Sequence, residues 1–135
     1  MRRLGCMLLA LLLILSLTAC GKESELSFTN SLSTTIENVY INSIDQDTWG
    51  DAITYAKISS GNTIHFDFEK IGDGPGIYDI GVIDSNAMNY DTYDVELAIG
   101  DNIALSGTSS AAVCTVTHAD GTTDTYEAIV YENEE

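Results

Sequence analysis

Short runs of alternating apolar and polar residues recur along the chain from Leu26 onward, separated by turn residues. Ile64, Phe66 and Phe68, for example, alternate with polar neighbours. This period of two places apolar side chains on one face of a strand, whereas a helix would need a period of 3.6. No amphipathic helical pattern follows Leu26. The alternation predicts strands over 26–29, 34–43, 63–68, 77–84, 90–98, 102–106, 112–118 and 125–131.

Turn residues between these runs predict how the strands are connected. Gly100-Asp101-Asn102 is typical of a tight hairpin, and His118-Ala119-Asp120-Gly121 predicts a second one near the C-terminus. The segment 45–60 has no clear period and is expected to be a long loop. Several strands with one buried face predict a single antiparallel β-sandwich of seven to eight strands over 26–132, with a small barrel as the alternative. Residues 133–135 form an acidic tail.

The N-terminus has the three parts of a secretory signal. Arg2 and Arg3 precede a mostly apolar stretch from Leu4 to Leu17, and small residues follow. Leu17-Thr18-Ala19-Cys20 resembles the lipobox of bacterial lipoproteins. The resemblance implies a signal peptide over 1–19, with a helical apolar core, and a diacylglyceryl thioether on Cys20.

Residues 20–25 would then be the lipidated cysteine and a short tether, and the domain would lie outside the cytoplasm on the cell membrane or outer membrane. Fatty chains such as palmitate on Cys20 would make the membrane itself a partner, since two or more acyl chains hold a protein stably on a bilayer. A plain signal peptide, or a membrane helix with an incidental cysteine, is the alternative interpretation.

The charge of the chain limits its partners. Removal of Arg2 and Arg3 with the leader lowers the formal net charge from −16 to −18. Such a field repels nucleic acid and anionic lipid, so neither is expected as a ligand. The negative charge is compatible with cationic partners, and like-charge repulsion that keeps the domain soluble is the alternative explanation of it. Beyond Cys20 the sequence contains one further cysteine, Cys114, so no intramolecular disulfide is expected once Cys20 is acylated.

The globular part resembles small, uncharacterised bacterial exported β domains. The resemblance covers roughly residues 27–105. It is carried by Phe28-Thr29-Asn30, Val39-Tyr40-Ile41-Asn42-Ser43, Trp49-Gly50-Asp51 and Ile77-Tyr78-Asp79-Ile80-Gly81-Val82-Ile83-Asp84. This chain departs from the pattern at Ser43-Ile44, where a proline is expected after the serine. The family has no established activity, so the resemblance implies a fold rather than a function.

Two acidic loops are candidate calcium sites, because calcium takes six to eight oxygen ligands. The first supplies Asp45, Asp47 and Asp51, and the second supplies Asp84, Asn86 and Asp91. The spacing is not that of an EF-hand, which would need an oxygen ligand at Trp49 and a glutamate at Ala56. The alternative is that these side chains form Asx-turns. No other cofactor is expected.

Aromatic and acidic residues indicate two further roles. Trp49, Tyr90 and Tyr93 are candidates for stacking on sugar rings, although tyrosine is also a common strand residue. Asp79, with Trp49 and Gly50, is expected to be structural, its carboxylate capping backbone N–H groups near the Trp49-Gly50 loop.

No nucleophile, metalloprotease or phosphate-loop motif is present. We therefore expect no enzyme, but a lipoprotein that binds an envelope protein or glycan. A calcium-stabilised module is the alternative, and a small envelope hydrolase or glycan-binding domain is third.

Overall fold

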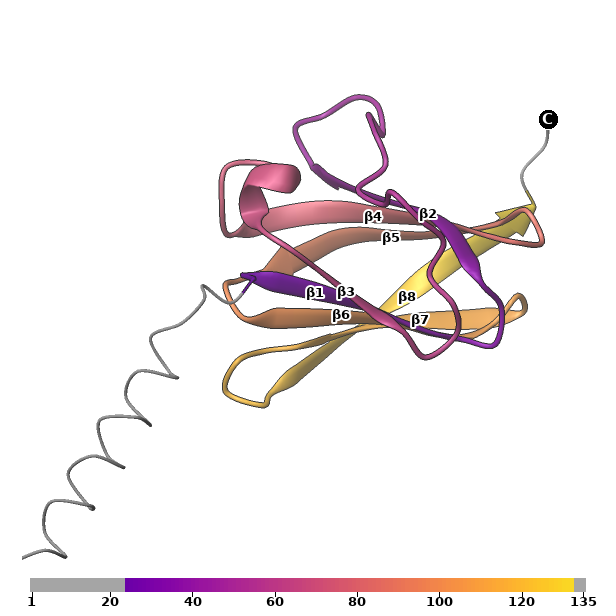
Figure 1. The fold of residues 1–135 in the computed structure, drawn as a ribbon. Coiled ribbons are helices and arrows are strands. Elements are labelled where there is room, and N and C mark those ends of the chain that lie inside the picture. Colours follow the sequence, from indigo (N-terminus) through magenta and orange to yellow (C-terminus); the bar gives the residue numbers. More distant parts are fainter. Residues whose placement is uncertain (1–23, 133–135) are drawn as a thin grey trace, which may run out of the picture.

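The computed structural model describes residues 24–132 and contains eight strands. They are β1 (Leu26–Leu32), β2 (Ile36–Ser43), β3 (Thr63–Phe66), β4 (Gly76–Asp84), β5 (Met88–Leu97), β6 (Asp101–Thr108), β7 (Ala111–Thr117) and β8 (Thr123–Glu132) (Figure 1). A short 3-10 turn, η1 (Phe68–Lys70), follows β3. The signal peptide, Cys20 and the acidic tail predicted above lie outside the described residues.

All eight strands belong to one curled sheet, an open half-barrel with the order β2-β4-β5-β8-β7-β6-β1-β3. The curl is made by β8, which pairs with β7 through residues 123–128 and with β5 through residues 129–132. Figure 1 shows β8 running from one side of the domain to the other. The pairs are antiparallel apart from β1 with β6, which is parallel and corrects the prediction of a wholly antiparallel arrangement.

The all-β prediction is confirmed, and every predicted strand overlaps an observed one with ends that differ by at most three residues. The hairpin at His118–Gly121 is also confirmed, because β7 and β8 pair on either side of it and Gly121 has a φ of 90°. The prediction of a hairpin at Gly100-Asp101-Asn102 was wrong. The turn exists, but β8 and β7 lie between β5 and β6 in the sheet, so the chain crosses here from one side of the curl to the other.

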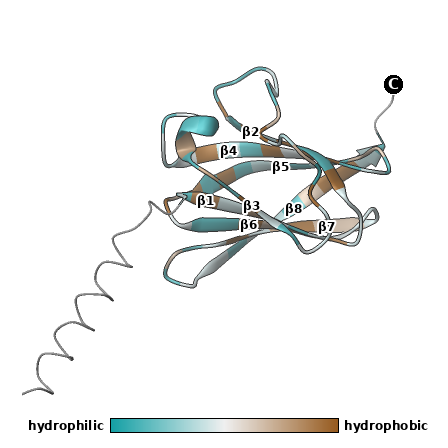
Figure 2. Cartoon of the chain, viewed as in Figure 1, coloured by the Kyte–Doolittle hydropathy of each residue, from teal (hydrophilic) through white to brown (hydrophobic). Residues whose placement is uncertain are grey.

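The core lies inside the curl and receives side chains from both of its sides. Phe28, Val39, Val95, Ile103 and Val116 are completely buried. Hydrophobic and hydrophilic residues alternate along the strands (Figure 2), as a sheet with one buried face requires. The two sides of the sheet therefore share a single hydrophobic core.

The connection from β2 to β3 runs along the free edge of β2 and adds to the core. Ile58 exchanges two backbone hydrogen bonds with Ile36 (2.8 and 2.9 Å), and the N–H of Ile53 donates to the carbonyl of Val39 (2.8 Å). Both Ile53 and Ile58 are buried. The predicted long loop is thus fixed in place without a helix, and it covers an edge strand that would otherwise present unpaired backbone groups.

The buried amide of Asn30 joins β1 to this connection. Its Nδ2 donates to the carbonyls of Thr34 (2.8 Å) and Ile58 (2.9 Å), and its Oδ1 accepts from the N–H of Leu32 (3.0 Å). Because β2 and β3 are the two ends of the sheet, their connection spans the open seam, and Asn30 ties that connection to the strand beside β3.

We predict that Asn30→Ala lowers the free energy of unfolding by about 3 kcal/mol, because it leaves buried donors and acceptors without partners. Urea denaturation followed by circular dichroism measures the change. Ser31→Ala, on the exposed face of the same strand, is the control and should change stability by less than about 0.5 kcal/mol. Equal stability of the two variants would contradict the role assigned to Asn30.

Candidate functional site

The outer face of β2, β4, β5 and β8 carries the residues that form the candidate site. The strand register aligns Tyr40, Gly81, Asp91 and Ile129 in one row across the four strands. Asn89 lies two residues before Asp91 on β5 and therefore on the same face. It pairs with Ile83 and Tyr131, which continue the next row.

Gly81 makes room for the tryptophan of the long loop. A Cβ atom at this position would lie 3.2 Å from both Cη2 and Cζ3 of Trp49, so the indole rests directly on the strand. The ring centroids of Tyr40 and Tyr93 lie 6.5 and 6.4 Å from that of Trp49. The Asn42 side-chain amide donates a hydrogen bond to the Trp49 carbonyl and so holds the loop in place.

A cavity of about 430 Å³ opens beside the indole. We call it the Trp49 groove; its lining includes Tyr40, Trp49, Gly81, Asn89, Asp91 and Tyr131. The combination of aromatic walls with a few polar groups is typical of small-molecule sites.

Asp91 is buried at the groove and organises two phenols. Its Oδ2 accepts hydrogen bonds from the hydroxyls of Tyr131 (2.7 Å) and Tyr93 (3.1 Å). The bond to Asp91, together with burial, raises the pKa of Tyr131 to about 12. Tyr131 therefore keeps its proton at physiological pH and remains a donor to the carboxylate.

Asn89 is the one unsatisfied group of this surface. The residue is 8% exposed, and its side-chain Nδ2 has no hydrogen-bond partner. Among the buried side-chain nitrogen and oxygen atoms of residues 24–132, no other lacks a partner. A buried donor without an acceptor costs about 1–3 kcal/mol and calls for an explanation.

The sugar-stacking residues predicted from sequence are brought together only in part. Trp49 and Tyr93 are neighbours on the outer face, but Tyr90 is buried in the core and donates to Asp84 (3.0 Å). Alternation along β5 explains the difference, because the side chains of Tyr90 and Tyr93 lie on opposite faces of the strand. Tyr40, Asn89 and Tyr131 were missed, although the alternation of Asn89, Asp91 and Tyr93 indicates a shared face.

The predicted calcium ligands do not form a cluster. Within residues 24–132, no group of three or more His, Cys, Asp or Glu side chains is placed to hold a metal ion. Asp84 is buried, and its Oδ1 accepts from the N–H groups of Asn86 (2.9 Å) and Met88 (3.0 Å), the Asx-turn arrangement. The other candidate calcium ligands are Asp91, which lines the groove, and the exposed residues Asp45, Asp47, Asp51 and Asn86.

Asp79 caps a backbone N–H group, but not the one expected. Its Oδ1 accepts from the N–H of Asp94 (3.0 Å), which lies in a bulge of β5 and has a φ of 56°. A bulge leaves one residue out of the strand pairing, and the Asp79 carboxylate satisfies the N–H at this point. The Trp49-Gly50 loop is held by Asn42 instead.

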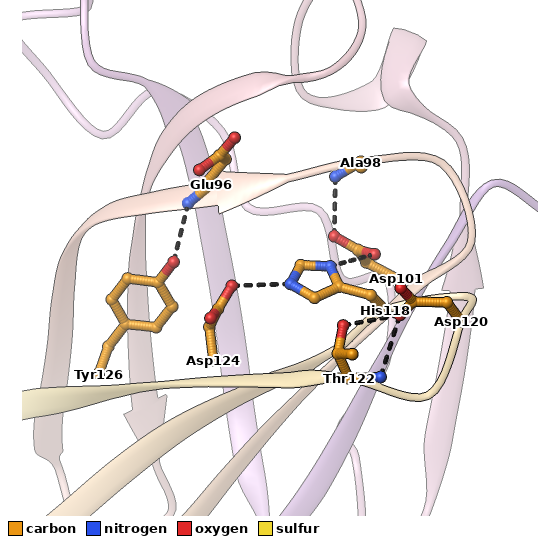
Figure 3. Close-up of polar contacts among 8 residues, drawn as sticks. All are labelled: Glu96, Ala98, Asp101, His118, Asp120, Thr122, Asp124 and Tyr126. Atoms are coloured by element: carbon orange, nitrogen blue, oxygen red, sulfur yellow. Dashed lines mark hydrogen bonds and ion pairs between the residues drawn. The ribbon is translucent and has the colours of Figure 1, made fainter.

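A second polar cluster surrounds His118 at the end of β7 (Figure 3). Its Nδ1 lies 2.9 Å from Oδ1 of the buried Asp101, and its Nε2 lies 2.7 Å from Oδ2 of Asp124. These hydrogen bonds, with Asp124 contributing most, raise the pKa of His118 to about 9. Both ring nitrogens are occupied by carboxylates, so neither is left to activate a hydroxyl or thiol.

Cys114 is equally unsuited to nucleophilic chemistry. Burial raises the pKa of its thiol to about 12, which keeps it protonated and inert.

No known protein-family model matches the chain, and neither a curated protein nor a solved structure shows significant similarity to it. None of the helical segments within residues 24–132 has the length and apolar character of a membrane span.

We predict that Gly81→Val displaces the indole of Trp49 from β4, because the added side chain would occupy its contact surface. Trp49 is the single tryptophan of the chain, so fluorescence reports on it alone. The emission maximum should move to longer wavelength and acrylamide quenching should increase. Ile77→Val, four residues earlier on the same strand face, is the control. An unchanged spectrum for Gly81→Val would contradict the packing described here.

We predict that His118 makes stability depend on pH. Its pKa in the folded state is about 9 against an ordinary 6.5, so its stabilising effect is complete below about pH 6.5 and is lost as the pH rises through about 9. The free energy of unfolding, measured with urea, should fall over this window in the wild type. His118→Gln should flatten that fall, while the matched variant His65→Gln should retain it. An identical pH profile for wild type and His118→Gln would overturn this prediction.

Proposed function

We propose that the chain is a lipoprotein of the bacterial cell envelope that binds a ligand in the Trp49 groove. The observation that carries the binding role is the unpaired, buried Asn89 amide at an aromatic-lined cavity of about 430 Å³. Such a donor calls for an explanation, and a ligand acceptor would satisfy it once the amide rotates toward the groove.

The proposed anchor rests on the sequence. Leu17-Thr18-Ala19-Cys20 follows a cationic start and an apolar core, and the first strand begins at Leu26. A tether from Cys20 to Leu26 extends at most about 20 Å at roughly 3.3–3.6 Å per residue. The domain would therefore work close to the membrane surface, outside the cytoplasm.

The two-sheet sandwich remains our proposal for the finer description of the fold. Its support is the shared core, to which β4 and β5 contribute from one side and β6 and β7 from the other. The long strand β8 would then be the element that belongs to both sheets.

Binding is favoured over catalysis and over metal binding. The carboxylates on both ring nitrogens of His118 and the burial of Cys114 favour a domain that binds rather than reacts. The acidic surface disfavours nucleic acid as a partner. Calcium stabilisation stays a prediction from the sequence, since the candidate ligands have other partners or lie apart from a common cluster in the described region.

We predict that Cys20→Ser abolishes lipidation and membrane attachment, because the lipid is attached through a thioether bond and serine has no sulfur to form it. Metabolic labelling with a radioactive fatty acid and sedimentation of membranes measure both effects in cells that express the full chain. Cys114→Ala, which removes the other cysteine beyond the predicted cleavage site, is the matched control and should label normally. Full labelling of Cys20→Ser would refute the proposed anchor.

A further inference from the structure

We infer that the Trp49 groove binds a sugar residue of an uncharged glycan. This inference rests on the binding role proposed above and adds the chemical class of the ligand. The argument depends on three properties of the groove: its aromatic surface, the hydrogen-bonding groups of Asn89 and Asp91, and the charge around them.

The aromatic surface supplies a flat apolar contact. The indole of Trp49 is packed on Gly81, and the rings of Tyr40 and Tyr93 lie within 6.5 Å of it, so its position is fixed before a ligand arrives. A pyranose ring has one face formed largely of C–H groups, which are weakly positive and pack well on the negative face of an aromatic ring. A fixed ring also loses little entropy on binding.

The hydrogen-bonding groups match hydroxyl chemistry. Asn89 lines the groove with an amide whose Nδ2 has no partner, and Asp91 offers a carboxylate. The Nδ2 atom is covered by protein atoms, so the amide must rotate toward the groove for a ligand to accept from it. Within residues 24–132, the side-chain hydrogen bonds to Asp91 all end on Oδ2, which leaves Oδ1 as an acceptor. A sugar hydroxyl both donates and accepts, so adjacent hydroxyls of one ring can satisfy the two side chains.

Charge separates a sugar from the other ligands that aromatic sites bind. An anion would meet the Asp91 carboxylate in a chain of net charge −16 and would be repelled. A quaternary ammonium ion suits aromatic rings and a carboxylate, but it has no acceptor for the Asn89 amide. An uncharged polyol with one apolar face fits all three properties.

The unpaired amide also gives the inference a test that separates binding from folding. Asn89→Leu keeps roughly the shape of the side chain and removes the donor. Because Nδ2 makes no hydrogen bond within the described protein, this substitution should leave the melting temperature unchanged or raise it. If the Asn89 amide served folding instead, Asn89→Leu would lower the melting temperature.

The experiment uses the full chain, extracted from membranes in a detergent without a sugar headgroup. Trp49 fluorescence is titrated with neutral hexoses, N-acetylhexosamines and their di- and tetrasaccharides, and separately with tetramethylammonium chloride. We expect at least one saccharide to give a saturating change with a Kd of about 1 mM or tighter. Asn89→Leu should weaken this binding at least about tenfold, and Asn86→Ala, in the exposed turn before β5, should leave it intact.

Three results would overturn the inference in distinguishable ways. Saturating binding of tetramethylammonium without any saccharide response would replace the ligand class and leave the proposed binding role standing. No response to any saccharide would by itself remove the sugar, and a lower melting temperature for Asn89→Leu in addition would remove the binding role as well. Saccharide binding that Asn89→Leu does not weaken would place the sugar outside the Trp49 groove.

Discussion

The amide of Asn30 closes a sheet that would otherwise remain open along one side. The two end strands, β2 and β3, are not paired with each other, and only their connection spans the gap. Ile58 in that connection pairs with Ile36 of β2, and its carbonyl accepts from Asn30 of β1. The Asn30 side chain, together with backbone hydrogen bonds between Asn30 and residues 61 and 62, therefore links the connection to β1, the strand beside the β3 border. Because the bonds are shielded from water, they contribute more than exposed bonds of the same length would.

The candidate site depends on this closure through the same loop. Once the connection is fixed at Ile53 and Ile58, its preceding residues pass over the outer face of the sheet, where Gly81 leaves space for an aromatic ring. The strand alternation that buries Tyr90 places Asn89 and Asp91 outside. The groove thus needs three separate sequence features: a glycine in β4, a polar stretch in β5 and a tryptophan in a loop.

The strands could be predicted from sequence because alternation and turn residues are local signals. The pairing could not. Gly100-Asp101-Asn102 indicates a tight turn equally well whether the next strand pairs with its predecessor or crosses the core, and β6 does the latter. Asp84 shows the same limit at a site, since its sequence context fits a calcium ligand or an Asx-turn, and only the positions of the Asn86 and Met88 N–H groups show that the turn is formed. Likewise, Asp79 was expected to cap a backbone group, but its partner Asp94 depends on a bulge that no local pattern marks.

Because Trp49 lies on the seam-spanning connection, binding of the proposed ligand in the groove would be coupled to the stability of the domain. A molecule bound against the indole would restrain the segment that fastens the borders of the sheet. Ligand binding and folding would then be linked, so that each stabilises the other. With the proposed membrane tether and ligand, the protein would resist unfolding and proteolysis best while the ligand is bound. Its lifetime at the cell surface would register how much ligand is present there.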